Sequence, residues 1–400
     1  MYCVRRVSDD IYWVGGSDRR ISLFENIFPV PRGVSYNSYL IMDEKTVLLD
    51  TVDHSISRQF IENITHVLKG RKLDYIVVNH MEPDHCAVIG DIILRYPDVK
   101  VIGNAKTFQM INQFFGDMKY DPVVVKEGDT FNTGRHNLNF VMAPMVHWPE
   151  TMVTFDDVTG TLFSADAFGT FGALDGTIFA DEVDFDRDWL DDARRYYTNI
   201  VGKYGAQVQA VLKKAANLDI KMICPLHGPI WRENLGYIIE KYDKWGKYEP
   251  EEKGVVIAYA PMYGNPENMA NVLANILAEK GVKNIRVYDV SNTHVSQLVS
   301  ESFKYSNIVL ASPTYNGGVY PIMENFIADI KALNLQNRDI AVMDNGTWAV
   351  TAGKFIVNKI NEMKNMRVIE KIFSVKSAMD ESQYEEINEF AEMIISSLNN

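Results

Sequence analysis

Short apolar runs between polar turns dominate the first 250 residues of the chain. A helical spacing of apolar positions separates some of these runs, as at Ser57–Lys69, and a longer helical pattern covers Trp189–Ala216. Strands that arrive partly as hairpins and partly alternating with helices indicate a two-layer sheet core with helices outside. The predicted strands are Tyr39–Met42, Val47–Asp50, Ile76–Asn79, Val101–Gly103, Leu138–Ala143, Met152–Phe155 and Thr161–Ser164.

The pattern changes at Tyr248–Gly254, a charged stretch that reads YEPEEKG and interrupts the apolar rhythm. We predict an interdomain linker here, with one domain over residues 1–250 and another over residues 254–400. In the second domain apolar strands alternate regularly with helical segments, which is typical of a doubly wound, parallel, five-stranded sheet in an α/β fold. The predicted strands are Val255–Tyr259, Ile285–Val290, Ile308–Ala311, Ile340–Met343 and Val368–Val375. Such a sheet binds its ligand beyond the carboxyl ends of the strands.

Composition and charge narrow the class of protein. The 400 residues are 46% hydrophobic and 23% charged, as expected for a folded chain, and the net charge of −13 argues against general binding to nucleic acid. The cysteines, Cys3, Cys86 and Cys224, lie far apart and predict no disulfide framework. We expect no membrane span, because no apolar run reaches the ~18 residues that one needs. The N-terminal sequence lacks the apolar core of a secretory signal, so we expect a cytoplasmic location.

Metal-ligand residue types gather directly after the predicted strand at Ile76–Asn79. The stretch VVNHMEPDHCAVI contains His80, Glu82, Asp84 and His85. Because Pro83 disfavours a regular helix, we predict a loop from which alternate side chains enter one pocket. The alternative, a solvated polar turn, is disfavoured by the density of ligand-type side chains. The sequence therefore predicts a metal site at this strand end.

Three more residues of these types stand at predicted strand ends elsewhere. His147 lies in APMVHWPE, Asp166 in LFSADAFG and His227 in CPLHGPIW. Each alone fits an ordinary polar loop residue, but with the first four they form a set that is large enough for two metal ions sharing one bridging carboxylate. The remaining histidines have no such neighbours, and we predict that they lie on the surface or in helices; they are His54, His66, His136 and His294.

The spacing His-x-x-x-Asp-His, with distant His, Asp and His, resembles the metallo-β-lactamase superfamily. In the zinc hydrolases of that superfamily a second histidine usually stands where this chain has Glu82, and a carboxylate there favours a harder, redox-active metal such as iron. Together with the motifs quoted above and GVSYNSYLI at Gly33–Ile41, this substitution makes the whole chain resemble the flavodiiron proteins. The resemblance implies an N-terminal metallo-β-lactamase-like αββα sandwich followed by a flavodoxin-like domain.

The resemblance also implies roles for individual residues. One iron would be held by His80, Glu82 and His147, the other by Asp84, His85 and His227, with Asp166 as the bridge. Either Tyr196 or Tyr197 would place a hydroxyl near the irons, and Glu25 stands where relatives have His or Glu. The predicted catalytic residues are Asp166, His85 and Tyr197.

Three loops after strands of the second domain resemble the FMN-binding loops of flavodoxins. The predicted FMN-binding residues are Pro261, Met262, Tyr263, Gly264, Asn265, Pro266, Pro313, Thr314, Tyr315, Asn316, Asn345, Gly346, Thr347, Trp348 and Ala349. Asn265 is the predicted N-cap of the following helix and Pro266 its first residue. The first loop departs from the flavodoxin pattern because Pro261–Pro266 contains neither Ser nor Thr, so we expect weaker FMN binding than usual.

As a flavodiiron protein, the chain is expected to reduce O₂ to water, NO to N₂O, or both, with electrons passing from an external donor through FMN to the irons. The donor would be rubredoxin, a reduced deazaflavin or another reduced carrier, and the expected assembly is a head-to-tail homodimer or a dimer of such dimers. Two alternatives remain at this point: a dinuclear zinc hydrolase with an accessory flavodoxin domain, and a noncatalytic electron-transfer or gas-sensing flavoprotein. The sequence does not distinguish O₂ from NO.

Overall fold

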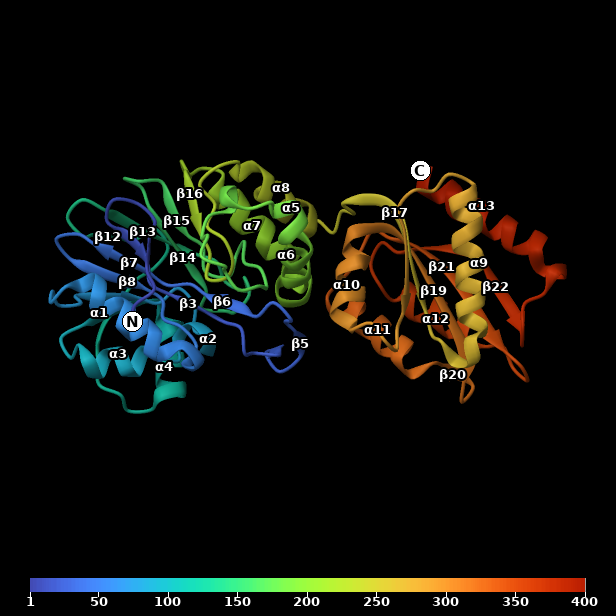
Figure 1. Ribbon diagram of the computed structural model, residues 1–400, viewed down its shortest axis with the longest axis horizontal. Coiled ribbons are helices and arrows are strands. Elements are labelled where there is room, and N and C mark those ends of the chain that lie inside the picture. Colours follow the sequence, from blue (N-terminus) through green and yellow to red (C-terminus); the bar gives the residue numbers. More distant parts are fainter. Residues whose placement is uncertain (400) are drawn as a thin grey trace. The chain divides into compact units, whose positions relative to one another are not determined.

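The computed structural model describes residues 1–399 and divides the chain into two compact units (Figure 1). The first unit comprises Met1–Tyr197 and Ala206–Asp243, and the second comprises Thr198–Gly205 and the chain from Lys244 onward. The predicted linker Tyr248–Gly254 is shorter than expected, because its last three residues already belong to strand β17 (Glu252–Tyr259). Within residues 1–399, no helix combines the length and the apolar character needed to cross a bilayer.

The first unit is built on two β-sheets. Their strand orders are β1-β2-β7-β8-β9-β10-β11 and β12-β13-β14-β15-β16. The bounds are β1 (Arg5–Arg6), β2 (Ile11–Trp13), β7 (Tyr39–Met42), β8 (Thr46–Leu49), β9 (Tyr75–Val77), β10 (Lys100–Gly103), β11 (Asp121–Val124), β12 (Thr130–Asn132), β13 (Asn137–Met142), β14 (Met152–Asp156), β15 (Thr161–Phe163) and β16 (Met222–Cys224). Two short ribbons complete the unit: β3 (Gly16–Asp18) with β6 (Val34–Tyr36), and β4 (Leu23–Phe24) with β5 (Phe28–Pro29).

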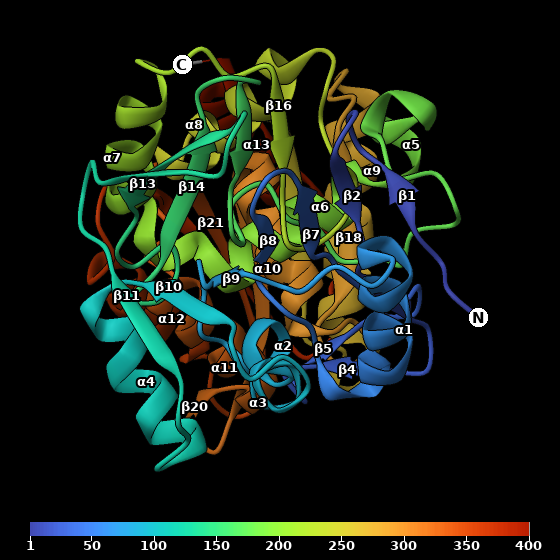
Figure 2. The same cartoon turned by 90° about the vertical axis from the view of Figure 1, so that its left-hand side faces the viewer.

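The two sheets pack face to face around one apolar core. Alternate residues of a strand point to the same face of its sheet, and in each sheet one face is apolar. Tyr39 and Leu49 of the first sheet therefore share a buried cluster with Phe140 and Phe163 of the second. Helices cover the outer faces, with one group on each side of the pair of sheets (Figures 1 and 2). These helices are α1 (Ser57–Leu68), α3 (Ile89–Arg95) and α4 (Ala105–Phe115) on one side, and α7 (Gly205–Ala215) and α8 (Leu235–Gly246) on the other. The predicted αββα sandwich is confirmed.

The second unit is a parallel sheet with the strand order β18-β17-β19-β21-β22. Numbered within the unit this order is 2-1-3-4-5, the flavodoxin-like arrangement, so that prediction is also confirmed. All five predicted strands are present, as β17, β18 (Ile285–Asp289), β19 (Tyr305–Tyr315), β21 (Asp339–Gly346) and β22 (Arg367–Lys376), and a short β20 (Gly318–Val319) pairs with β19.

Helices cover both faces of this sheet, which explains why its strands are apolar throughout. Val255 and Ile257 pack into the cluster that contains α9 (Asn265–Glu279) and α13 (Tyr384–Asn399). Val256 and Ala258 pack into the other cluster, with α10 (Val295–Lys304), α11 (Pro321–Ala332) and α12 (Ala352–Asn361). Because helices cover both faces, a ligand can reach this sheet only at its ends. The loops that follow the carboxyl ends of the strands can form a site there.

The long helix predicted at Trp189–Ala216 is wrong in one respect, because it is broken. Helix α6 (Leu190–Tyr196) is followed by a π-helical segment at Tyr197–Val201, a 3₁₀ turn at Gly202–Tyr204 and then α7. Gly205 lies where a Cβ atom would approach the Gly246 carbonyl oxygen to 2.4 Å, so close packing requires glycine here. Apolar periodicity continues through such a change of helix type, which explains why the sequence predicts one helix.

His136 is buried, with an exposed fraction of only 2%, so the prediction that it lies on the surface or in a helix is wrong. It lies in the turn between β12 and β13, where its Nδ1 is 2.7 Å from Asp156 Oδ2 and its Nε2 is 3.0 Å from Asp10 Oδ2. Burial alone would lower the pKa of His136, but the hydrogen bonds and charges of these two carboxylates outweigh burial and raise it. The partners come from distant parts of the chain, so sequence spacing gave no sign of them.

We expect this buried ion pair to make stability depend on pH. Because the pKa of His136 is raised on folding, its contribution is complete below the unfolded value of about 6.5 and is lost as pH rises through the folded pKa. The urea midpoint of the wild type should therefore fall as the pH is raised from about 6 to about 8.5. His136→Gln should flatten this dependence, whereas His54→Gln, at an exposed position, should not. An equal slope in the His136→Gln protein would contradict the assignment.

Arg338 organises the second unit from within its core, where it is 1% exposed. Its guanidinium donates to the carbonyl oxygens of Ser302 (2.8 Å) and Phe303 (2.6 Å) in the last turn of α10. It also donates to the carbonyl of Tyr248 at 2.7 Å, in the segment that leads into β17. These carbonyls lie at a helix end and in a loop, where no backbone partner is available. One side chain thus ties the start of the unit to a helix and to β21.

Arg338→Met should destabilise the second unit by about 2–4 kcal/mol, because several buried carbonyls would lose their donors. Urea unfolding followed by circular dichroism measures the loss. Arg286→Met, at an exposed position of β18, serves as the matched control and should change stability by no more than about 0.5 kcal/mol. Equal stabilities of the two variants would show that Arg338 has no such role.

Candidate metal centre

The first four candidate ligands follow strand β9, but their backbone is not the loop that the sequence predicts. Glu82 is extended, with φ −63° and ψ 140°, and Pro83–Cys86 forms the one-turn helix α2. Pro83 occupies the first helical position, where its fixed φ and missing N–H are tolerated, so proline here starts a helix and does not prevent one. His80 and Glu82 therefore leave from extended chain, whereas Asp84 and His85 leave from a helical turn.

The other three candidates leave from the second sheet. His147 lies between β13 and β14, Asp166 follows β15, and His227 follows β16. Ala165, directly before Asp166, has a φ of 51°, a left-handed conformation that is uncommon outside glycine. This sharp turn at the end of β15 directs the Asp166 carboxylate into the space between the two sheets' strand ends.

The structure brings all seven candidate side chains together in two groups. In each group the potential ligand atoms lie within 4.8 Å of one another; the groups are His80, Glu82, His147 and Asp166, and Asp84, His85 and His227. In the first group His147 Nε2 is 3.0 Å from Glu82 Oε2 and 3.2 Å from Asp166 Oδ2. His80 Nε2 completes it, at 3.3 Å from the same oxygen of Glu82.

Asp166 faces both groups at once, with a different oxygen toward each. Its Oδ2 approaches His147, whereas its Oδ1 is 3.0 Å from His85 Nε2 in the second group. In that group His227 Nε2 is 3.1 Å from His85 Nε2 and 3.3 Å from Asp84 Oδ2. A carboxylate placed in this way can bridge two metal ions, which stand roughly 3.5–4 Å apart in two-metal sites.

Buried groups behind the histidines fix their ring orientations. His80 Nδ1 is 2.8 Å from Glu150 Oε1, so its Nε2 is left to face the centre. His227 Nδ1 donates to the carbonyl of Ser35 at 2.7 Å, with the same effect. Asp50 accepts from the backbone N–H of Asn79 and of His80, at 2.7 and 3.2 Å, and holds the start of the ligand segment. Such outer contacts orient metal-bound imidazoles and set their basicity.

The electrostatics of the centre fit a cation. Burial alone would lower the pKa of His147, but hydrogen bonds with Asp166 and Glu82 outweigh it and raise the pKa to about 9. Burial opposes the charged form of Asp166 as well, yet the charges of His85 and His80 and hydrogen bonds with His147 and His80 hold its pKa well below the usual range. Asp84 is buried, and neither of its oxygens accepts a hydrogen bond from any of residues 1–399. Carboxylates and imidazoles packed this closely are the donor set that iron accepts.

A cleft of about 390 Å³ reaches the centre and has an acidic lining. Besides Glu82 and Asp84 it is lined by Glu25 and Asp53. Glu25 lies in the turn between β4 and β5 with a φ of 49°. Although the residue as a whole is exposed, its carboxyl group is withdrawn from water beside Glu82; this burial, the hydrogen bond with Glu82 and its charge raise the pKa of Glu25 to about 8.

Of the two adjacent tyrosines, Tyr196 contacts the candidate ligands. Its ring centroid is 5.4 Å from that of His227, and its hydroxyl is buried without a hydrogen-bond partner among residues 1–399. Burial raises the pKa of Tyr196, and the charges of Asp166 and Glu82 raise it further. Tyr197 packs edge-on against Tyr242, with centroids 4.9 Å apart. Helix α6 ends at Tyr196 and the π-helical segment begins at Tyr197, so the two side chains have different neighbours. The spacing of apolar residues does not predict which of the two tyrosines lies near the ligands.

The three candidate flavin loops lie at the carboxyl ends of β17, β19 and β21. Thr314 links two of them, because its Oγ1 accepts from the backbone N–H of Thr351 at 2.8 Å and of Ala352 at 3.2 Å. In the same loops Trp348 is 80% exposed and Tyr263 is 91% exposed. Aromatic faces this open, at the point where the strand order reverses, suit a planar ring system such as isoalloxazine.

One prediction within these loops, the N-cap of the first helix, is wrong. Asn265 is the first residue of α9 and not its N-cap, because the cap is Gly264 in a left-handed conformation with φ 81°. In the described part of the chain no side chain caps this helix, so its first N–H groups are available to an anion, except at Pro266, which has none. The side-chain amide of Asn345 donates to the carbonyls of Val375 and Ser377 at 3.0 and 2.7 Å, and the role of this residue in FMN binding stays a prediction.

The sequence pattern did not predict every residue that contacts the candidate ligands. Glu150 and Asp50 were not predicted, and the choice between Tyr196 and Tyr197 was left open. Glu150 stands three residues after His147 in HWPE, and this proximity to a candidate ligand was the available signal. Asp50 is the last residue of a predicted apolar strand, where a carboxylate is commonly a turn residue. Its role becomes visible only when β8 pairs with β9.

Comparison with known proteins identifies the chain. Residues 34–228 match the family described as ODP family beta lactamase. The chain is 32% identical to an anaerobic nitric oxide reductase flavorubredoxin of Escherichia coli over 86% of its own length and 72% of that protein. It is 31% identical to an uncharacterised protein of Methanocaldococcus jannaschii over 98% of both chains.

Solved structures agree over the full length. The rubredoxin oxygen:oxidoreductase of Desulfovibrio gigas superposes with a TM-score of 0.93, at 28% identity and with 99% of both chains covered. A flavoprotein of Thermotoga maritima superposes with a TM-score of 0.90, at 26% identity and with 99% and 98% covered. The chain therefore belongs to the flavodiiron family of oxidoreductases.

Proposed function

We propose that the protein reduces O₂ to water, NO to N₂O, or both, at a diiron centre held by the seven clustered side chains. The observation that carries the proposal is Asp166, whose two oxygens face two separate groups of buried ligand atoms. Two relatives support the proposal. One is named an anaerobic nitric oxide reductase flavorubredoxin, from Escherichia coli, and the other a rubredoxin oxygen:oxidoreductase, from Desulfovibrio gigas.

Two ferrous ions and FMN, when bound, supply the electron transfer that converts the gas. Within the chain, His80, Glu82 and His147 would hold one ion and Asp84, His85 and His227 the other. Asp166 would contribute one carboxylate oxygen to each position, and its negative charge would be shared by the two ions. Glu150 and the Ser35 carbonyl hold the rings of His80 and His227 so that Nε2 faces the ions. Tyr196 presents a buried hydroxyl that can donate a hydrogen bond to a polar group formed at the centre.

FMN would lie across the loops at the ends of β17, β19 and β21, with its phosphate at the start of α9. The open N–H groups after Gly264 would bind the phosphate in place of the Ser and Thr hydroxyls that this loop lacks. Trp348 and Tyr263 would cover the flavin ring. The donor is proposed to be rubredoxin or a similar reduced carrier, and the assembly a head-to-tail homodimer in which the flavin of one protomer meets the iron centre of its partner.

A zinc hydrolase is the competing function for a metallo-β-lactamase-like fold, and metal content separates the two. We expect protein purified without oxygen to carry about two irons and one FMN per chain and to have no esterase activity. Two zinc ions with hydrolysis of an ester would contradict the proposal. A metal-free protein with bound FMN would favour a purely electron-transferring flavoprotein.

Asp166→Ala should abolish consumption of both gases while leaving the FMN absorption spectrum intact, because it removes the group shared by the two metal positions. Gas electrodes and iron analysis measure the two effects. Asp219→Ala, at an exposed aspartate of the same unit, is the matched control and should behave as the wild type. Gas consumption that survives in the Asp166→Ala protein would refute the bridging role.

Trp348→Ala should weaken FMN binding about tenfold, because a pair of stacked aromatic rings contributes about 0.5–1.5 kcal/mol beyond its buried area. Quenching of flavin fluorescence during titration of the flavin-free protein measures the affinity. Tyr384, an exposed aromatic residue beyond edge strand β22, provides the control variant Tyr384→Ala. If both variants bind FMN as tightly as the wild type, Trp348 does not cover the flavin.

A further inference from the structure

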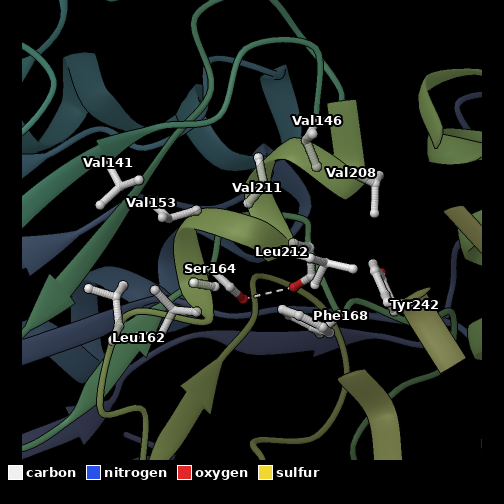
Figure 3. A pocket seen from close by; sticks show the side chains of 13 residues that line it. Val141, Val146, Val153, Leu162, Ser164, Phe168, Val208, Val211, Leu212 and Tyr242 are labelled. Carbon is white, nitrogen blue, oxygen red and sulfur yellow. Dashed lines mark hydrogen bonds between the residues drawn. The ribbon is translucent and has the colours of Figure 1, made fainter. Parts of the chain in front are cut away.

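An apolar cavity lies between helix α7 and strands β13, β14 and β15 of the first unit (Figure 3). Its lining is almost entirely aliphatic, with Val141, Val153 and Leu162 on the strands and Val208, Val211 and Leu212 on the helix (Figure 3). The volume is about 30 Å³, and roughly 10–15 Å³ on the same scale holds one water molecule. The cavity is therefore large enough for a diatomic molecule and too small for an organic substrate.

The lining is apolar although it contains Ser164 and Tyr242. Ser164 donates its hydroxyl hydrogen to the Ala167 carbonyl at 2.7 Å (Figure 3). Tyr242 contributes its ring, which packs against Phe168 with centroids 4.5 Å apart, and the surface that faces the cavity is apolar. A water molecule needs two to four polar partners to be stable in a cavity, and apolar cavities of this kind remain dry and accept apolar guests such as xenon.

Two residues of the cavity lining are direct neighbours of candidate ligands in the chain. Val146 and Ala167 line the cavity, and each is covalently next to a candidate ligand, His147 and Asp166 respectively. The side chains of these two ligands meet at 3.2 Å. The cavity lining is thus joined through the backbone to two candidate ligands whose side chains contact each other.

The outer end reaches the flank of α7. Val208 is buried, whereas Val211, Leu212 and Ala215 are half-buried, so the lining passes from the interior toward solvent along this helix. Lys214 fixes the helix against the second sheet, because its Nζ donates to the carbonyl of Met142 at 2.8 Å. The cavity is consequently a defined space between rigid elements, with an apolar approach from outside.

We propose that this cavity binds the gaseous substrate, a small apolar diatomic molecule, and supplies it to the metal centre. The assignment of its occupant rests on the proposed function. O₂ and NO share the required chemistry, because both are small and weakly hydrated, and the aliphatic walls favour either over water. Ions and polar solutes are excluded by the same walls, so the route is selective without any specific hydrogen bond.

Xenon tests the site without reliance on turnover. In crystals of the metal- and FMN-loaded protein under xenon pressure, an anomalous peak is expected among Val153, Leu162 and Val211. Val211→Phe fills the cavity and should abolish that peak, and Ala215→Leu provides a second, smaller filling. Ala210→Phe, on the exposed side of the same helix, should retain it.

The same variants distinguish a binding role from an inert void. With iron content unchanged, Val211→Phe and Ala215→Leu should lower kcat/KM for O₂, for NO or for both several-fold, and Ala210→Phe should not. Absence of xenon from the wild-type cavity, or unchanged kcat/KM for both gases in both filled variants, would overturn the inference. A wild type that reduces neither gas would overturn the proposed function itself, whereas missing xenon in an active enzyme overturns only the cavity.

Discussion

Burial of three carboxylates in one small space is the constraint on which the first unit depends. Glu82, Asp84 and Asp166 are each less than a tenth exposed, and an ionised carboxylate withdrawn from water costs several kcal/mol unless cations meet it. The histidines offset part of this cost, as the raised pKa of His147 indicates. Metal ions would offset the rest, so binding of metal and stability of this region are one equilibrium. The strand ends of two different sheets must close on each other to build the centre, which makes the αββα packing a condition for the chemistry.

The second unit keeps a buried core although the loops at the carboxyl ends of its strands are exposed. Helices on both faces bury the sheet, and Arg338 satisfies carbonyls that would otherwise be stranded inside. The candidate flavin loops can then be exposed and aromatic, because they contribute little to the core. Gly346 illustrates the precision of these loops: a Cβ atom there would lie 1.9 Å from the Ala349 carbonyl oxygen. The tight turn that presents Trp348 therefore depends on a glycine.

Sequence patterns predicted the strands, the helices and the clustering of residues at strand ends. They did not predict contacts between residues that are far apart in the chain. The alternation of strands and helices predicted the αββα unit and the parallel unit. The seven ligand-type residues at strand ends lie together in the structure because strand ends converge in such folds, and their role as metal ligands stays a prediction. The break between α6 and α7 was missed since apolar periodicity runs through it. Pro83 was misread because proline stops a helix from within but begins one at its first position. Asp10 and Asp156 surround His136 only after folding, and Glu150 reaches His80 across 70 residues of chain. No single-sequence spacing encodes those contacts.

The proposed reaction consumes a gas, electrons and protons, and the first unit offers distinct surroundings for the gas and for charged species. The cleft at Glu25 and Asp53 is acidic and opens onto Glu82 and Asp84, an environment that attracts cations and repels anions. The cavity behind Val146 and Ala167 is aliphatic, an environment that admits neither. The two linings share no residue, so a substitution in one can change entry of gas without changing the charge around the ligands. In the proposed arrangement the apolar walls also keep water away from the gas, and exclusion of water strengthens the electrostatic contacts made by the ligands. The apolar face of α7 is thus part of the proposed route for the gas, just as the ligand residues are part of the proposed metal centre.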